Sequence, residues 1–140
     1  MAIAAWAVLR ESGLDVEGVA GHSLGEYSAI CASDIVSRED TFRLVFKRGE
    51  LMHREAEKNK GAMHAIIGLS IDRVKEIVSE AKTEGVVAVA NHNAEKQIVI
   101  TGAPDPVKKA SSIASSHGAR AIPLKVSGAW HSQLIHGAQD

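Results

Sequence analysis

A serine with a glycine two residues away on each side is the feature of this sequence that most directly suggests chemistry. The stretch "GVAGHSLGEYSA" places Ser23 between Gly21 and Gly25. Gly-x-Ser-x-Gly between a strand and a helix is the nucleophile-elbow pattern, in which a sharp turn exposes the serine hydroxyl. The Leu24 N–H at the start of that helix would then face a developing oxyanion. The alternative is that Ser23 is only a small residue at a tight corner.

A serine nucleophile needs a base, and the sequence offers seven histidines. His131 is the favoured base because it follows "VSGAW" at a chain reversal, where functional groups are commonly displayed. Three others, in helix or strand contexts, are expected to have surface or satisfied-core roles: His53, His64 and His117. The five-residue separation of His131 and His136 does not suit one helix face, so no zinc site is expected.

Arg48 lies in "KRGELM", beside a glycine that would leave room around its side chain. A guanidinium there could make a two-pronged contact with a carboxylate. Spacing alone favours the alternative of a surface arginine.

The composition is that of a folded protein: 140 residues, of which 45% are hydrophobic and 24% charged. The net charge of −1 and the scarcity of aromatic residues disfavour nucleic-acid binding. Cys31 is the only cysteine, which indicates a reducing cytosol and a cytoplasmic protein. The apolar start meets Arg10 and Glu11 too early to span a bilayer, so no membrane association is expected.

The elements that must position Ser23 can be read from the surrounding pattern. The chain is expected to begin in a helix, and Gly18–Gly21 should end a buried strand before the corner at Ser23. "GEYSAICAS" should form the next helix. Another helix should open at the Ser37 capping box "SRED" and end near Gly61.

Residues 61–126 have a βαββαβ pattern, in which Ser70 caps the first helix and prolines occupy the first turn of the second. This order predicts a ferredoxin-like subdomain with two helices on one face of a sheet. Residues 127–140 should return the chain to the first part. We therefore expect residues 1–60 and 127–140 to form one part and residues 61–126 the other.

Three motifs in this order, "GHSLGEYSA", "RGELM" and "VSGAWHSQL", closely resemble those of the malonyl-CoA:acyl-carrier-protein transacylases and related acyltransferase domains of fatty-acid and polyketide synthases. The resemblance implies an α/β fold, with a partial α/β-hydrolase-like core carrying the elbow. Ser23 would be the acylated nucleophile and His131 its general base and acid. Arg48 would bind the free malonyl carboxylate, and the Leu24 N–H would donate to the oxyanion.

The same resemblance suggests further substrate-binding residues. Trp130 stands where many malonyl-selective members carry phenylalanine, so a bulky ring would exclude a branched extender. "NHNAEKQIVITG" resembles the stretch of the ferredoxin-like subdomain that faces the active-site cleft, which makes Asn91 and Asn93 candidates.

The implied reaction moves a malonyl group from coenzyme A to the phosphopantetheine thiol of acyl carrier protein through a malonyl-serine, with no metal or redox cofactor. Family members are longer at both ends, so an internal fragment is expected. Two alternatives remain. One is a serine esterase or thioesterase, for which the sequence places no acidic residue persuasively as the third triad member and leaves Asp72 and Asp105 open. The other is an inert fragment that acts only as a binding module.

Overall fold

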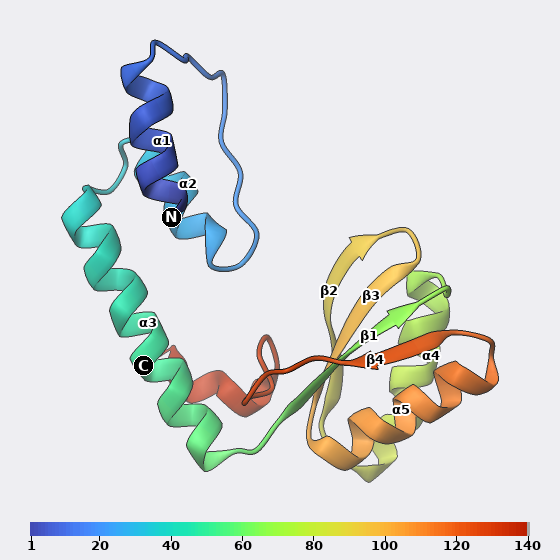
Figure 1. Cartoon of the computed structure of the whole chain (residues 1–140). Helices are drawn as coiled ribbons and strands as arrows, with labels where there is room; N and C mark the ends of the chain where they lie inside the picture. The colour runs from blue at the N-terminus through green and yellow to red at the C-terminus, as the bar shows by residue number, and fades with distance from the viewer. Residues whose placement is uncertain (140) are drawn as a thin grey trace. The chain divides into compact units, whose positions relative to one another are not determined.

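The protein divides into two compact units, Met1–Glu50 and Leu51–Asp140. A computed structural model describes residues 1–139, and Figure 1 gives the element labels used below. The division falls inside the long helix α3 (Arg38–Lys58), ahead of the boundary expected at residue 61. Each unit is described by itself.

Unit 1 consists of α1 (Ala2–Glu11), α2 (Gly25–Ala32) and the first part of α3. An exposed ion pair between Arg10 Nη1 and Asp34 Oδ1, 2.8 Å apart, ties α1 to the residues that follow α2. The predicted capping box at the start of α3 is confirmed. Ser37 Oγ accepts a hydrogen bond from the Asp40 N–H at 3.0 Å and donates one to Asp40 Oδ2 at 2.7 Å.

The strand expected at Gly18–Gly21 is not formed, and that prediction was wrong. Residues 14–22 are irregular, and α2 begins directly after the corner at Ser23 and Leu24. The physical reason is pairing. A strand exists only where its backbone bonds to a neighbouring strand, and the described residues of unit 1 contain none.

Unit 1 also buries little apolar surface. Within residues 1–50, only Cys31 and Thr41 are buried, whereas several large apolar side chains of its helices are exposed, including Val8, Leu9, Leu44 and Phe46. Cys31 is a free cysteine. The main hydrophobic core of the described chain is in unit 2.

Unit 2 is built on a four-stranded antiparallel sheet in the order β2-β3-β1-β4. The strands are β1 (Ala62–Ile67), β2 (Val87–Ala94), β3 (Gln97–Gly102) and β4 (Arg120–Pro123). The helix α4 (Ile71–Ala81) and the short 3-10 helix η1 (Lys82–Glu84) connect β1 to β2, and α5 (Pro104–Ser116) connects β3 to β4. The predicted βαββαβ order is confirmed.

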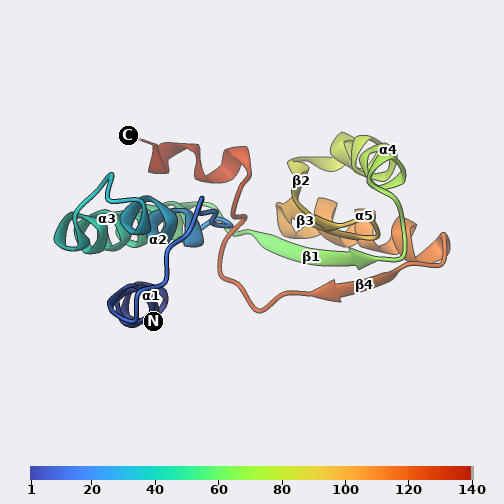
Figure 2. The ribbon, with the colours of Figure 1, turned by 90° about the horizontal axis from the view of Figure 1, so that it is seen from above.

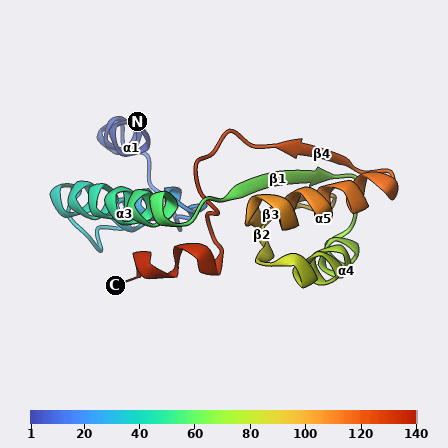
Figure 3. The ribbon, with the colours of Figure 1, turned by 90° about the horizontal axis from the view of Figure 1, so that it is seen from below.

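Both helices of this sheet begin as their sequences predicted. Ser70 Oγ accepts a hydrogen bond from the Arg73 N–H at 3.4 Å, and proline occupies the first turn of α5. Figures 2 and 3 show α4 and α5 on the same face of the sheet. The Ser70 cap and the proline therefore begin α4 and α5, the two helices that cover one face of the sheet.

The two faces of the sheet have different partners because side chains alternate along a strand. Ile66 of β1 and the isoleucines of β3 pack against α4 and α5 in the larger core. Met63, Ala65 and Val99 point to the opposite face, where the half-buried ring of Trp130 packs on them. The chain then turns at residues 129–132 and ends in the 3-10 helix η2 (Gln133–Ala138).

Within residues 1–139, no helix combines the length and apolar character needed to cross a bilayer.

Candidate active site

The corner predicted at Ser23 is present in unit 1. Ser23 has φ +51°, in the left-handed region that is uncommon for residues other than glycine. The Gly25 N–H bonds to the His22 carbonyl at 2.9 Å, and the Glu26 N–H bonds to the Ser23 carbonyl at 3.1 Å. These two bonds start α2 directly over the corner. Ser23 is thus held in the strained turn that a nucleophile elbow requires.

The two glycines of the motif are not equivalent. A Cβ built on Gly21 would lie 2.2 Å from the Gly25 carbonyl carbon, so only glycine fits there. A Cβ on Gly25 meets no described atom within 4 Å. Close approach of the backbone therefore explains why glycine is required at Gly21, but it does not explain the glycine at Gly25.

Leu24 is the N-cap residue of α2, so its N–H lies at the positive end of the helix dipole. Among the hydrogen bonds of the described residues, none has this N–H as donor. The Leu24 N–H therefore stays a candidate oxyanion donor.

Arg48 of α3 reaches Ser23 within unit 1. Its Nη2 donates a hydrogen bond to Ser23 Oγ at 3.1 Å, and its Cζ lies 5.9 Å from the centre of the Tyr27 ring. The arginine is half-buried. The expectation from spacing alone, a surface arginine, does not describe this position.

In unit 2, His131 also has a left-handed backbone, with φ +62°. A turn closes around it, because the Ser132 N–H bonds to the Ala129 carbonyl at 3.2 Å and Ser132 Oγ donates to the same oxygen at 2.7 Å. Trp130, the preceding residue, packs on the sheet face opposite the helices. His131 itself is exposed in a tightly defined turn.

The candidate asparagines lie on β2, which has two irregularities in its pairing with β3. The first, between Val89 and Asn91, sets Asn91 opposite Val99, and Val99 faces the side of the sheet that carries Trp130. Asn93 falls in the second irregularity, near the end of the strand, and is exposed. Asn91 pairs with a residue of the Trp130 face, whereas Asn93 lies at the hairpin end.

The candidate residues thus form two groups. Ser23, Leu24 and Arg48 come together in unit 1. Trp130 and His131 adjoin one face of the unit 2 sheet, together with Asn91, which pairs with Val99.

Of the three other histidines considered, His53 and His117 are exposed and His64 is half-buried, and each has a polar neighbour. His53 Nε2 lies 3.6 Å from Glu57 Oε1, His64 Nδ1 lies 2.6 Å from Ser111 Oγ, and Arg73 Nη2 lies 2.8 Å from His117 Nε2. Within residues 1–139, no three His, Cys, Asp or Glu side chains form a group that could hold a metal ion.

The two acidic residues left open as a third triad member lie at the first turns of the two sheet helices. Asp72 is in α4 and Asp105 in α5, and both are exposed. Those helices cover the face opposite the one on which Trp130 packs.

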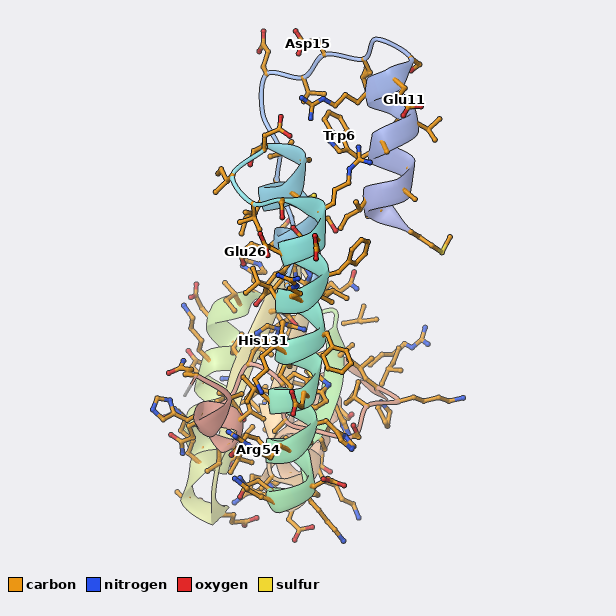
Figure 4. All side chains as sticks on the ribbon, turned by 90° about the vertical axis from the view of Figure 1, so that its left-hand side faces the viewer. Trp6, Glu11, Asp15, Glu26, Arg54 and His131 are labelled. Atoms are coloured by element: carbon orange, nitrogen blue, oxygen red, sulfur yellow. The ribbon has the colours of Figure 1, made fainter. Side chains whose placement is uncertain are left out.

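Sequence reasoning missed three polar residues: Arg54 and Glu55 in the last turns of α3, and Asn59 directly after it. Figure 4 labels Arg54 and His131. Arg54 and Asn59 hydrogen-bond to η2, just beyond His131 in the sequence, and Glu55 binds Arg54. No local pattern signals this, because "HREAEKNK" has the composition of a solvated helix face.

Comparison with known proteins agrees with these features. Residues 1–140 match the family described as the Acyl transferase domain. The chain belongs to this family. It is 44% identical over 133 residues to the malonyl CoA-acyl carrier protein transacylase of Bacillus subtilis (strain 168), covering 94% of this chain and 42% of that protein.

Solved structures give the same result. The acyl-carrier-protein S-malonyltransferase of Burkholderia pseudomallei 1710b aligns with a TM-score of 0.94 and 39% identity, over 99% of this chain and 46% of that chain. A type II PKS acyl-carrier protein in complex with its malonyl-transacylase gives a TM-score of 0.93 and 36% identity, over 98% of this chain and 45% of that one. The mixed α/β fold is that of these enzymes. The chain spans less than half of their length.

Proposed function

We propose that this chain is the central part of a malonyl-CoA:acyl-carrier-protein transacylase. In this proposal, residues 1–60 and 127–140 belong to a partial α/β-hydrolase-like core, and residues 61–126 form an inserted ferredoxin-like subdomain. The sheet order β2-β3-β1-β4 with two helices on one face supports the second assignment. The left-handed corner at Ser23 supports the first.

The reaction has two half-reactions with Ser23 as the acyl carrier. Ser23 Oγ attacks the thioester carbon of malonyl-CoA while His131 accepts the hydroxyl proton. The carbon–sulfur bond then breaks, coenzyme A leaves as a thiol with that proton, and malonate remains as an ester on Ser23. The phosphopantetheine thiol of acyl carrier protein reverses these steps. It gives its proton through His131 to Ser23 Oγ and takes the malonyl group.

The remaining candidates bind the substrate. The Leu24 N–H donates to the oxyanion of the tetrahedral intermediate. Arg48 binds the free carboxylate of the malonyl group, which distinguishes malonyl from acetyl thioesters. Trp130 limits the size of the acyl side chain, and Asn91 and Asn93 contact the substrate from the subdomain. The residues present require no metal or redox cofactor for these steps.

The observation that carries the proposal is the 3.1 Å hydrogen bond from Arg48 Nη2 to Ser23 Oγ. It brings a carboxylate-binding cation to the hydroxyl of a serine held in a strained turn. A hydrolase of neutral esters has no need of a cation there. The similar malonyl-transacylase that was solved in complex with an acyl-carrier protein supports acyl carrier protein as the second substrate.

Mass spectrometry after incubation with malonyl-CoA tests the proposal. We expect a malonyl adduct on the peptide that contains Ser23, lost in Ser23→Ala and kept in the exposed control Ser33→Ala. Adding holo acyl carrier protein should discharge the adduct to its thiol. A folded chain without adduct would favour the inert binding module, and hydrolysis faster than transfer would favour the thioesterase.

A further inference from the structure

We propose that Arg54, Glu55 and Asn59 are positioning residues that hold His131 in its left-handed turn. We call these three side chains, with the backbone carbonyls of Leu134 and Gly137, the α3–η2 clamp. The inference rests on the proposed role of His131 as general base, and it adds residues that neither the motifs nor that role identified.

The turn at His131 needs support from outside itself. A non-glycine residue with φ +62° is in a sparsely populated conformation that costs on the order of 1–2 kcal/mol. Such a backbone persists only when its surroundings fix it. The bonds of Ser132 to the Ala129 carbonyl close the turn but do not attach it to the rest of unit 2.

The chain before His131 is fixed by packing. Ala129 is fully buried, and a Cβ on Gly61 would lie 2.1 Å from its backbone nitrogen. A Cβ on Gly128 would lie 2.6 Å from the Trp130 ring and 2.9 Å from Ala56 Cβ. These contacts leave little freedom on the N-terminal side of the turn.

The chain after His131 is fixed by polar contacts from the end of α3 and from the residue that follows it. Asn59 Nδ2 donates to the Leu134 carbonyl at 2.9 Å, and Arg54 Nη2 donates to the Gly137 carbonyl at 2.5 Å. Both acceptors belong to η2, which runs beside the C-terminal half of α3 (Figures 1 and 4). These two bonds anchor the chain on the C-terminal side of the turn.

Glu55 orients the arginine of the clamp. Its side chain is only 7% exposed, and its carboxylate accepts hydrogen bonds from Lys58 Nζ and Arg54 Nε, each at 2.9 Å. The hydrogen bond from Lys58, followed by that from Arg54, lowers the pKa of Glu55 below its ordinary value, so the group is a carboxylate at neutral pH. Gly137 allows this approach, because a Cβ there would lie 2.6 Å from Glu55 Oε2.

The clamp matters because a general base must be held within hydrogen-bonding reach of the proton it accepts. A displacement of about 1 Å can cost roughly 100-fold in rate. Fixing the backbone on both sides of His131 limits such displacement. The clamp therefore acts through His131 and does not itself touch the substrate.

The test compares Arg54→Met, Asn59→Ala and the matched control Arg43→Met in the full chain. Arg43 lies on the same helix, and among the residues that the structure describes its ion pairs are with the exposed Glu39 and Asp40. One readout is amide hydrogen exchange of residues 129–138 against that of β1 and β3. The other is the pKa and line width of the His131 imidazole in NMR spectra, assigned with His131→Gln.

We expect exchange in residues 129–138 to rise about tenfold in Arg54→Met and in Asn59→Ala, since each loses a hydrogen bond, and the His131 signal to shift or broaden. The strands should keep their protection, and Arg43→Met should match the parent chain. Arg54→Lys, which keeps the charge beside Glu55, should restore part of the protection. Unchanged exchange and an unchanged His131 signal in both clamp variants would overturn the inference.

These readouts separate the inference from the proposed function. If the parent chain acquires no malonyl adduct, the proposed function fails, yet the His131 signal still decides whether the clamp positions that residue. If the adduct forms, the clamp variants should lower kcat for transfer and shift its pH profile. A change in KM alone would contradict the inference that the clamp positions His131 as the general base.

Discussion

The Arg48 guanidinium donates a hydrogen bond to the Ser23 hydroxyl across 3.1 Å while lying against the Tyr27 ring, with Cζ 5.9 Å from its centre. The ring face favours the cation and holds it in place before any substrate binds. A bidentate bond to a carboxylate is stronger than one bond to a neutral hydroxyl. If Arg48 binds the malonyl carboxylate as proposed, that carboxylate would displace the hydroxyl from Arg48 and leave it free to react.

Replacing Arg48 should change acyl selectivity more than total reactivity. In Arg48→Ala, we expect the rate of malonyl adduct formation on Ser23 to fall about 10- to 100-fold, because a charge-assisted bond is lost. The rate with acetyl-CoA should change much less. Mass spectrometry at a series of times with each thioester measures both rates, and Arg43→Ala serves as the control. Equal losses for both acyl groups would mean that Arg48 does not bind the carboxylate.

The two motif glycines should respond differently to alanine. Gly21→Ala places a Cβ 2.2 Å from the Gly25 carbonyl carbon, so the corner must open and the Ser23 adduct should be lost. Gly25→Ala adds a methyl group that meets nothing within 4 Å among the described residues, so the adduct should persist. Adduct yield and helical circular dichroism, recorded for both variants, check this. Equal loss in both would contradict the steric argument.

Local signals explain which parts of the fold could be predicted from the sequence. The Ser37 and Ser70 caps were identified because a cap involves only residues a few positions apart. The βαββαβ order was readable because α4 and α5 bury apolar residues at helical spacing, and β1 and β3 are short apolar runs. The turn residue Ser23 was identified through its flanking glycines.

Non-local contacts explain what was missed. The strand expected at Gly18–Gly21 has an apolar strand-like sequence, but strand formation depends on a partner that local sequence does not reveal. Arg54 and Asn59 look like solvated helix residues, and only folding brings the η2 carbonyls to them. For Arg48, spacing favoured the surface, and its partner Ser23 lies 25 residues away in the chain.

Gly49 offers a test of helix stability in α3. A Cβ there meets nothing within 4 Å among the described residues, so Gly49→Ala should raise the free energy of unfolding by about 0.5–1 kcal/mol through helix propensity. Gly118 has equally open space but φ +84°, so Gly118→Ala should lower stability instead. Urea unfolding of both variants measures the two changes. A gain in both would show that backbone conformation does not decide the sign.

His64 should make stability depend on pH. Burial between β1 and α5 lowers its pKa below the ordinary value of 6.5, and its Nδ1 lies 2.6 Å from Ser111 Oγ. Because the unfolded chain then binds the proton more readily, this contribution is present above about pH 6.5 and is lost as pH falls toward the folded pKa. Unfolding free energies measured between about pH 7.5 and 5 should decline less steeply in His64→Gln than in the parent chain. The control variant His53→Gln, at an exposed histidine, should show the same decline with pH as the parent chain. If His64→Gln also showed the parent's decline, His64 would not be the source of this pH dependence.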